Sequence, residues 1–193
     1  TSTSSAGLGT ETLISNFDDS SIVTCVPERR SRPWSTFDDG TVTPTLENVA
    51  DGADGTNNSI NFAGAAPTEW GAQFSGPMGG CYDASVYDGV YFWIKGTTGD
   101  GFIQFRVQLS KMLTPTLGYC DELAEDYCYS GFSTNLPITS EWTQHSVTWN
   151  QLAQRWGTPI ELDTTEIFSL DWEVNTEGAF DVYVDEVSFI TAK

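Results

Sequence analysis

The segment Gly101–Ser110 alternates apolar and polar side chains with a period of two residues. Successive side chains of a β-strand point to opposite faces of its sheet, so one set should be buried and the other should line the opposite face. The buried set would be Ile103, Phe105, Val107 and Leu109, and the opposite set Gln104, Arg106 and Gln108. These polar side chains are long, planar groups with several hydrogen-bonding atoms, which suit a ligand covered with hydroxyl groups. A solvated outer face of a sheet is the alternative interpretation.

A second segment, Thr165–Asn175, shows the same alternation near the end of the chain. Its two sets are Phe168, Leu170, Trp172 and Val174 on the apolar side, and Ser169, Asp171 and Glu173 on the polar side. The segment Asp88–Gly96 is apolar on both faces, which is typical of a strand in the middle of a structure. Further strands are predicted over Glu11–Asp19, Trp34–Phe37, Thr41–Asn48, Ser59–Ala63, Trp70–Ser75, Glu141–Trp149 and Gly178–Ile190.

Helical signals are confined to one place. Asn150–Trp156 favours one or two helical turns, ended by Gly157 and Pro159. Gly76–Gly80 and the long segment Lys111–Gly131 are expected to be loops. The sequence therefore predicts an all-β fold with one short helix.

The chain has 193 residues, 39 % of them hydrophobic and 13 % aromatic, which is enough for a packed core. We expect one β-domain over residues 11–193, preceded by a Ser/Thr-rich linker or tail over residues 1–10. The formal net charge of −19 disfavours nucleic acid and anionic membranes as partners and makes divalent cations suitable ligands. An acidic surface suited to an extracellular or saline habitat explains the same charge. No apolar run approaches the ~18–20 residues that a membrane helix requires.

The four cysteines occur at spacings that match no zinc-binding pattern. Two disulfides formed in an oxidising, extracellular compartment are the better explanation, and buried free thiols are the alternative. Three pairings are possible. We favour Cys120–Cys128, which closes one loop and leaves Cys25–Cys81 as the second pair.

Three motifs occur in an order that points to a known family: N-F-D-D near the beginning, W-I-K-G in the middle, and F-D-V-Y-V-D-E-V-S-F at the end. In this order they resemble the galactose-binding-like β-sandwich modules of secreted polysaccharide-degrading enzymes, especially the family 11 and family 30 carbohydrate-binding modules. The resemblance covers the chain from about Glu11 to Ile190. It implies an antiparallel β-sandwich of the jelly-roll type in which one concave sheet binds a glycan chain.

The resemblance also implies a structural calcium ion that ties the first strand to the last through carboxylates. The matching positions are Asp18 or Asp19 and Asp185, with Asp18 standing where the family more often has Glu. Carboxylates brought together from the two ends of a chain repel one another unless a cation or a proton compensates. Two separate surface acids are the alternative. The segment Asp51–Ser59 is rich in Asp, Asn and Gly and is interpreted as a tight turn rather than as a calcium loop.

A ligand site follows if the two alternating strands share one sheet. Their polar faces would then join an arginine, two glutamines and two acids, with Arg106 near Asp171. Such forked donors and paired acceptors satisfy sugar hydroxyls, and a stacking aromatic completes a glycan site. The predicted ligand-binding residues are Gln104, Arg106, Gln108, Asp171, Glu173 and, as the stacking group, Trp142; Trp70, Tyr119, Tyr127 and Tyr129 are further aromatic candidates in loops. A structural ion pair on an exposed sheet is the alternative.

Three functions are compatible with this sequence. The predicted one is a non-catalytic module that binds a β-glucan or a related plant cell-wall glycan and works as a monomer within a larger secreted enzyme. A small glycoside hydrolase would use Asp171 and Glu173 as its two carboxyl groups. The common hydrolase motifs are missing, and the single histidine, His145, lies among apolar residues. A calcium-stiffened adhesion or spacer domain is the third possibility.

Overall fold

The structure is a computed structural model that describes residues 13–18, 33–114, 118–175 and 178–191, with only the backbone described for residues 79–81. Two of the residues predicted above, Asp19 and Cys25, lie outside the described residues, as does the predicted tail over residues 1–10. The side chain of Cys81 is not described either, so the second disulfide stays a prediction.

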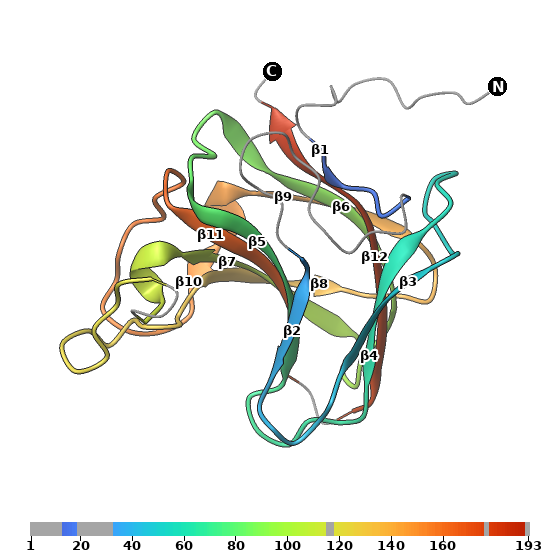
Figure 1. The fold of residues 1–193 in the computed structure, drawn as a ribbon, viewed down its shortest axis with the longest axis horizontal. Helices are drawn as coiled ribbons and strands as arrows, with labels where there is room; N and C mark the ends of the chain where they lie inside the picture. Colours follow the sequence, from blue (N-terminus) through green and yellow to red (C-terminus); the bar gives the residue numbers. More distant parts are fainter. Residues whose placement is uncertain (1–12, 19–32, 115–117, 176–177, 192–193) are drawn as a thin grey trace.

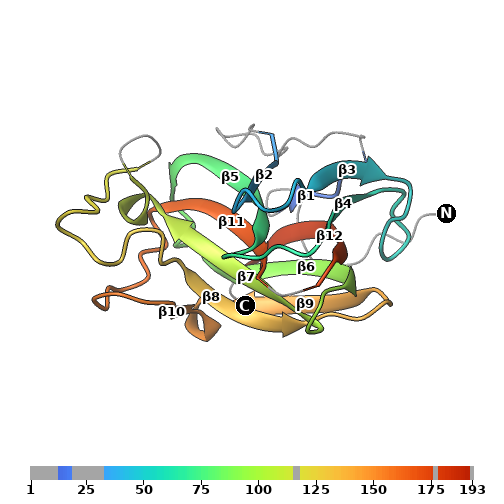
Figure 2. The same cartoon turned by 90° about the horizontal axis from the view of Figure 1, so that it is seen from below.

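Within the described residues, the strands form two six-stranded antiparallel sheets that pack face to face (Figure 1; Figure 2). The first sheet has the order β3-β4-β12-β6-β9, with β1 paired to β12, and the second has the order β10-β8-β7-β11-β5-β2. The strands of the first sheet are β1 (Leu13–Ser15), β3 (Thr45–Val49), β4 (Ser59–Gly64), β6 (Tyr87–Thr97), β9 (Thr143–Thr148) and β12 (Phe180–Thr191). Those of the second are β2 (Ser35–Asp38), β5 (Ala72–Tyr82), β7 (Phe102–Leu109), β8 (Phe132–Pro137), β10 (Ala153–Gln154) and β11 (Ile167–Val174).

Aromatic side chains fill the space between the two sheets. Trp172 of β11 stacks on Phe74 of β5 with ring centres 5.1 Å apart, and its edge meets Phe92 of β6 at 5.1 Å. Phe92 also contacts Phe105 of β7 at 5.2 Å, which joins the first sheet to the second. All four rings are fully buried. The apolar set predicted for β7 lies in this core, together with Val90, Phe92 and Ile94 of β6, and the antiparallel β-sandwich is confirmed.

Three local predictions were wrong or incomplete. Gly76–Gly80 is not a loop, because β5 runs unbroken from Ala72 to Tyr82. Pro77 is tolerated there because it lies beyond Ser75, the last residue of β5 that pairs with β2. The strand β8 was not predicted.

The helical turns expected over Asn150–Trp156 are a single 3₁₀ turn, Trp149–Gln151, after which the chain extends into β10. A second 3₁₀ turn covers Ser110–Met112. In the described part of the chain, no helix has the length and apolar character to cross a membrane.

Candidate functional site

The two alternating strands β7 and β11 are neighbours in the second sheet, as the site prediction required. Their register sets Arg106 directly opposite Asp171, Gln104 opposite Glu173, and Gln108 opposite Ser169. On its other side β11 pairs with β5, which places Ser75 beside Asp171 and Gln73 beside Glu173. The polar side chains of three adjacent strands therefore share the face of the sheet that points away from the core.

This polar face is buried rather than solvated. Arg106 is 6 % exposed, and Asp171 and Glu173 are each 1 % exposed. Nε and Nη2 of Arg106 both donate to Oδ2 of Asp171 at 3.3 Å, Nη1 pairs with Oε2 of Glu173 at 2.7 Å, and Nη2 also donates to Oε1 of Gln73. A second arginine, Arg155, donates from Nη1 to Oε1 of Glu173 at 2.8 Å. Two acids and two arginines thus form one rigid, charge-balanced network.

Gly131 makes room for this arrangement. A Cβ at Gly131 would lie 2.6 Å from Cδ of Arg106, and its φ of +62° falls in the left-handed region that favours glycine. The stem of the arginine can therefore lie against the backbone of the loop that leads into β8.

Among the described residues, three acceptor atoms of the polar face accept no hydrogen bond, apart from Oε2 of Glu173, which pairs with Arg106. They are Oδ1 of Asp171, Oε1 of Gln108 and Oε1 of Gln104, all of them buried, and the first two belong to residues that line the cleft described below. Since all three nitrogens of Arg106 are directed at protein acceptors, the face offers free acceptors to a ligand. A buried acceptor left unpaired costs free energy, about 1–3 kcal/mol, which a donor from a ligand would offset.

These groups form the floor of a cleft of about 730 Å³, within the ~300–1,000 Å³ range of small-ligand sites. Half-exposed aromatic side chains form its walls. Phe37 and Trp70 are 46 % and 48 % exposed, and Tyr129 and Trp156 are 40 % and 44 % exposed. Exposed rings around a polar floor are typical of sites that bind molecules with both apolar faces and hydroxyl groups.

Phe168 also lines the cleft, although the alternation of β11 predicts it on the core side. The register of β11 against both neighbouring strands shifts between Ile167 and Ser169, which marks a β-bulge. One extra residue in a strand turns the side chains on one side of it to the other face of the sheet. The prediction for Phe168 was therefore wrong, and those for Leu170, Trp172 and Val174, which are buried in the core, were right.

Trp142 is not near the cleft, so the structure does not bring it together with the other predicted ligand-binding residues. It lies next to β9 of the first sheet, where Nζ of Lys95 sits 4.8 Å from the centre of its ring. The ring of Tyr183 contacts the same ammonium group at 5.0 Å, and Asp51 pairs with it at 2.7 Å. Alternation assigns a residue to one face of its own strand, but it cannot say which of the two sheets the strand joins.

The aromatic residues Phe37 and Trp156, together with Gln73 and Arg155, belong to the site and were not predicted. Trp70 and Tyr129 were named only as aromatic candidates in loops. Gln73 lies between the core residues Ala72 and Phe74 in β5, and this alternation is the signal that could have found it. Phe37 is flanked in β2 by residues outside the core and carries no such signal. Arg155 and Trp156 were not identified because the segment Asn150–Trp156 was interpreted as helical. His145 is half-buried with its ring centre 6.1 Å from that of Phe92, and burial lowers its pKa.

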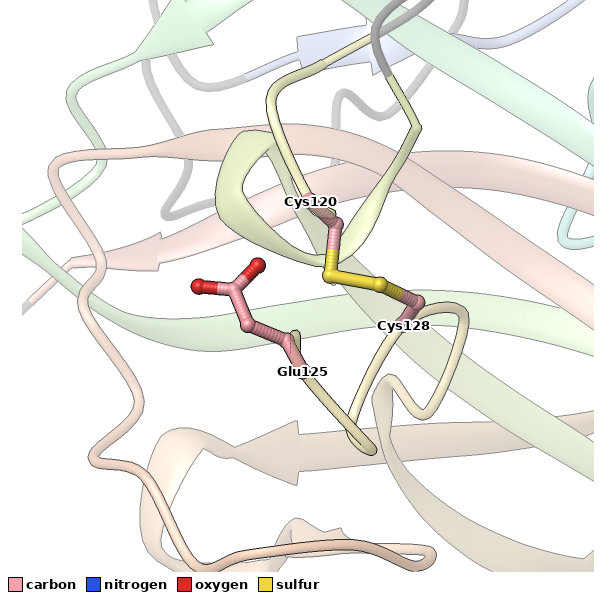
Figure 3. A group of neighbouring side chains, drawn as sticks. All are labelled: Cys120, Glu125 and Cys128. Atoms are coloured by element: carbon pink, nitrogen blue, oxygen red, sulfur yellow. A yellow bond between two sulfur atoms is a disulfide. The ribbon is translucent and has the colours of Figure 1, made fainter. Parts of the chain in front are cut away.

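The predicted disulfide Cys120–Cys128 is confirmed (Figure 3). Its Cα atoms are 5.7 Å apart, and it lies in the loop between β7 and β8. Glu125 lies beside it, and its carboxylate accepts hydrogen bonds from the backbone of Asp121 at 2.8 Å and from Tyr127 at 2.6 Å. These two cysteines and Glu125 are the only described group of potential metal ligands whose atoms lie within 4.8 Å of one another. Bonded sulfur atoms are not thiolates, so this group is not a metal site.

Acids from both ends of the chain meet at the loop after β3. The side chain of Asp185 in β12 accepts hydrogen bonds from the backbone of Ala53 at 2.7 Å and from the hydroxyl of Thr56 at 2.6 Å. Asp18 accepts from two successive backbone amides of the same loop at 2.7 and 3.0 Å. Burial raises the pKa of Asp185 to about 6, and burial together with the charges of Asp185, Asp18 and Asp54 raises the pKa of Glu186 to about 7. Burial and the neighbouring negative charges therefore both disfavour the ionised carboxylates of this group.

No protein-family model matches the sequence, and no curated protein matches it. Solved structures match it over almost its whole length. The family 11 carbohydrate-binding module of the cellulosomal cellulase Lic26A-Cel5E of Clostridium thermocellum has a TM-score of 0.67 at 14 % identity, with 97 % of each chain covered. A family 11 module from the same organism, in complex with a β-1,3-1,4-mixed-linked tetrasaccharide, has a TM-score of 0.65 at 13 % identity and covers 94 % of this chain and 95 % of its own.

The family 30 carbohydrate-binding module of the cellulase Cel9D-Cel44B of Clostridium thermocellum has a TM-score of 0.58 at 12 % identity, covering 94 % of this chain and 98 % of its own. Identities this low establish the fold. The chain therefore has the β-sandwich fold of the family 11 and family 30 carbohydrate-binding modules, as the resemblance of its motifs predicted.

Proposed function

We propose that this protein binds a neutral polysaccharide chain, a β-glucan or a related plant cell-wall glycan, in the cleft on the concave face of its second sheet, without cleaving it. The observation that carries the proposal is the combination of a rigid polar floor bearing two unpartnered acceptors with half-exposed aromatic walls. A neighbour of the same fold binds a mixed-linked β-glucan tetrasaccharide, which supports this choice of ligand class.

The floor and the walls of the cleft would contact different parts of the sugar. Sugar hydroxyls would donate to Oδ1 of Asp171 and Oε1 of Gln108, while the apolar faces of the sugar rings would stack on Trp70 or Trp156. Gln104 lies at the edge of this arrangement, where it donates to Asn135 at 3.2 Å. Gln104, Arg106 and Glu173, which the sequence predicts as ligand-binding residues, would in addition hold this floor rigid before the ligand arrives.

A neutral glycan fits the charge of the site. The two arginines of the cleft are each paired with a buried carboxylate, so no positive charge is left for a uronate or a sulfate group. The unpartnered oxygen of Asp171 and the formal net charge of −19 both repel anions.

A glycoside hydrolase is the second candidate, because two carboxyl groups do lie in the cleft. One of them would have to act as a general acid and carry a proton. Asp171 and Glu173 are each held in a buried ion pair with the guanidinium group of Arg106, which is a structural use of both carboxyl groups. This observation favours binding without hydrolysis.

Affinity electrophoresis in native gels that contain soluble polysaccharides tests the proposal. We expect retardation by mixed-linked β-glucan and none by polygalacturonate, with no fall in the viscosity of the glucan. Asp171→Asn keeps the size of the side chain and one acceptor oxygen, and it should weaken retardation. A fall in viscosity would identify a hydrolase, and the absence of retardation by every glycan would leave an adhesion or spacer domain as the better account.

We further propose that a calcium ion binds where Asp18 and Asp185 meet, with Asp19 as a third ligand. The donor set suits calcium because the acids offer hard oxygen atoms. Burial and neighbouring negative charges raise the pKa values of Asp185 and Glu186, and a bound cation would offset both effects. Bound calcium would supply positive charge that joins the loop after β3 to the last strand. Differential scanning calorimetry with calcium and with a chelator tests this: the midpoint temperature should rise with calcium and not with magnesium.

The remaining expectations concern the context of the module. We propose that the protein is extracellular, and the Cys120–Cys128 disulfide supports an oxidising compartment. We also propose that it acts as a monomer within a larger secreted enzyme. Sedimentation of the purified chain tests the first part of that statement and should give the mass of one copy, 21.1 kDa.

A further inference from the structure

Arg155 and Trp156 line the cleft but were not predicted as part of the site. They lie in a segment with little secondary structure of its own. They follow β10, a strand of two residues at the edge of the second sheet. Yet Arg155 reaches Glu173 in β11, and its guanidinium group lies 5.1 Å from the ring centre of Trp156. The segment needs an external support to hold both side chains at the cleft.

The loop between β7 and β8 provides that support. The hydroxyl of Ser130 accepts a hydrogen bond from the backbone N–H of Trp156 at 2.9 Å and donates to the carbonyl of the same residue at 2.8 Å. The backbone N–H of Arg155 donates to the carbonyl of Gly131 at 3.3 Å, and that of Thr158 donates to Oδ1 of Asp126 at 2.7 Å. Ser130 is fully buried, so water does not compete for these bonds.

The two segments are also in close steric contact. A Cβ at Gly157 would lie 2.6 Å from the carbonyl oxygen of Asp126, and the φ of Gly157 is +83°. Only glycine allows this approach. Figures 1 and 2 show the loop after β7 and the segment after β10 at the same end of the sandwich.

The Cys120–Cys128 disulfide restrains the loop between β7 and β8. Cys128 immediately precedes Tyr129 and Ser130, and its bond to Cys120 anchors it beside the turn after β7 (Figure 3). The backbone N–H of Cys120 donates to the carbonyl of Leu113 at 2.7 Å, and that of Tyr129 donates to the carbonyl of Met112 at 2.6 Å. A continuous set of contacts thus leads from the disulfide through Ser130 to one wall of the cleft.

We propose that Trp156 and Arg155 contact the bound glycan and that the Cys120–Cys128 disulfide is the positioning element that holds them there. This inference rests on the proposed function, since it adds a contact from Arg155 and a positioning role for the disulfide to the same cleft. Reduction of the disulfide would release one wall and leave the floor intact, because the floor is built from β5, β7 and β11 and lies against the aromatic core.

A double-mutant cycle measured by titration calorimetry with a soluble β-1,3-1,4-mixed-linked glucan tests the inference. The variants are Trp156→Ala, the pair Cys120→Ser/Cys128→Ser, and all three changes together. We expect Trp156→Ala and the cysteine pair each to lower the affinity about tenfold. We expect the triple variant to bind no more than about twofold more weakly than Trp156→Ala alone, because the disulfide acts through the tryptophan. Leu123→Ser, on the same loop and 99 % exposed, is the matched control and should bind like the wild type.

Amide hydrogen exchange supplies a readout that needs no ligand. In the cysteine pair variant, the amide of Trp156 should exchange at least tenfold faster, while the amides of Phe105 and Leu170 should keep their rates. Equal exchange at Trp156 with and without the disulfide would overturn the positioning role. A wild-type protein that binds the glucan while Trp156→Ala binds it equally well would overturn the contact role. Strictly additive losses in the cycle would overturn the positioning role, because the disulfide would then act independently of the tryptophan. If the wild type binds no glycan, the proposed function fails first and the assigned contacts fail with it.

Discussion

The cleft face of the second sheet and the outer face of the first sheet are built from similar types of residue, but these residues make different contacts. Both alternate core residues with aromatic and polar ones, and both hold a cation that is paired with acidic groups of the protein, Asp51 for Lys95 and Asp171 and Glu173 for Arg106. On the first sheet, Lys95 lies between the rings of Trp142 and Tyr183, so the aromatic faces are turned to the cation. On the second sheet, Arg106 is held by the carboxylates of Asp171 and Glu173 and by the amide oxygen of Gln73, and the aromatic rings are half-exposed at the walls. An aromatic ring can stack on a ligand only through a face that no protein group covers, and Arg155 covers one face of Trp156.

The largest expected effect in this comparison comes from Arg106. Arg106→Ala leaves the carboxylates of Asp171 and Glu173 buried without the cation that pairs with them, and it should lower the free energy of unfolding by about 3–5 kcal/mol. Urea unfolding followed by fluorescence measures this loss. Arg106→Lys keeps the charge and loses the forked geometry, so it should fall between the wild type and the alanine variant. A loss below 1 kcal/mol for Arg106→Ala would contradict the view that the floor is a coupled, buried network.

The aromatic walls should affect binding rather than stability. Trp70→Ala removes a ring that is 48 % exposed and should lower the affinity for mixed-linked β-glucan about tenfold, which corresponds to about 1.4 kcal/mol. Trp142→Ala, on the other sheet, should leave the affinity unchanged. Titration calorimetry of the two variants compares the sheets directly, and a larger loss for Trp142→Ala would move the site to the first sheet.

The acids at the loop after β3 predict how stability depends on pH when calcium has been removed. The folded-state pKa values of Asp185 and Glu186, about 6 and about 7, lie above their reference values of 3.8 and 4.5. Between these limits the folded protein binds more protons than the unfolded chain, so these two groups stabilise it at low pH and lose this contribution as pH rises from about 4 to about 7. The pKa of His145 is lowered by burial and acts in the opposite direction below pH 6.5, so it offsets part of the slope.

Thermal unfolding of the chelator-treated protein at pH 5 and pH 8 measures this effect. The midpoint should be lower at pH 8, and Glu186→Gln should reduce the difference. Added calcium should reduce it as well, because a bound cation favours the charged carboxylates. A midpoint that rises from pH 5 to pH 8 would show that the repulsion among these acids is unimportant.

The smallest expected effect belongs to Lys95. Its ion pair with Asp51 is partly exposed, so Lys95→Met should change stability by less than about 1 kcal/mol, and the change should shrink further in high salt. Urea unfolding at two salt concentrations measures it. A loss as large as that of Arg106→Ala would remove the distinction between the two faces.

The sequence by itself determined the class of fold and the faces of single strands. Period-two alternation places Phe105 and Trp172 in the core and Arg106 and Asp171 on the other face, because the direction of a side chain along a strand is a local property. The spacing of Cys120 and Cys128 made a local disulfide predictable for the same reason. The alternation fails where the backbone departs from regular geometry, as at the bulge beside Phe168.

Only the tertiary structure decided which strands are neighbours and which loops meet them. The sheet order sets Arg106 opposite Asp171 and assigns Trp142 to the other sheet, and both depend on hydrogen bonds between segments far apart in the chain. The wall residues Arg155 and Trp156 carry no periodic signal, since their place is fixed by Ser130 and Gly131 of a different loop. Local steric rules dictate how a strand alternates, whereas a binding site is assembled from contacts that exist only once the chain has folded.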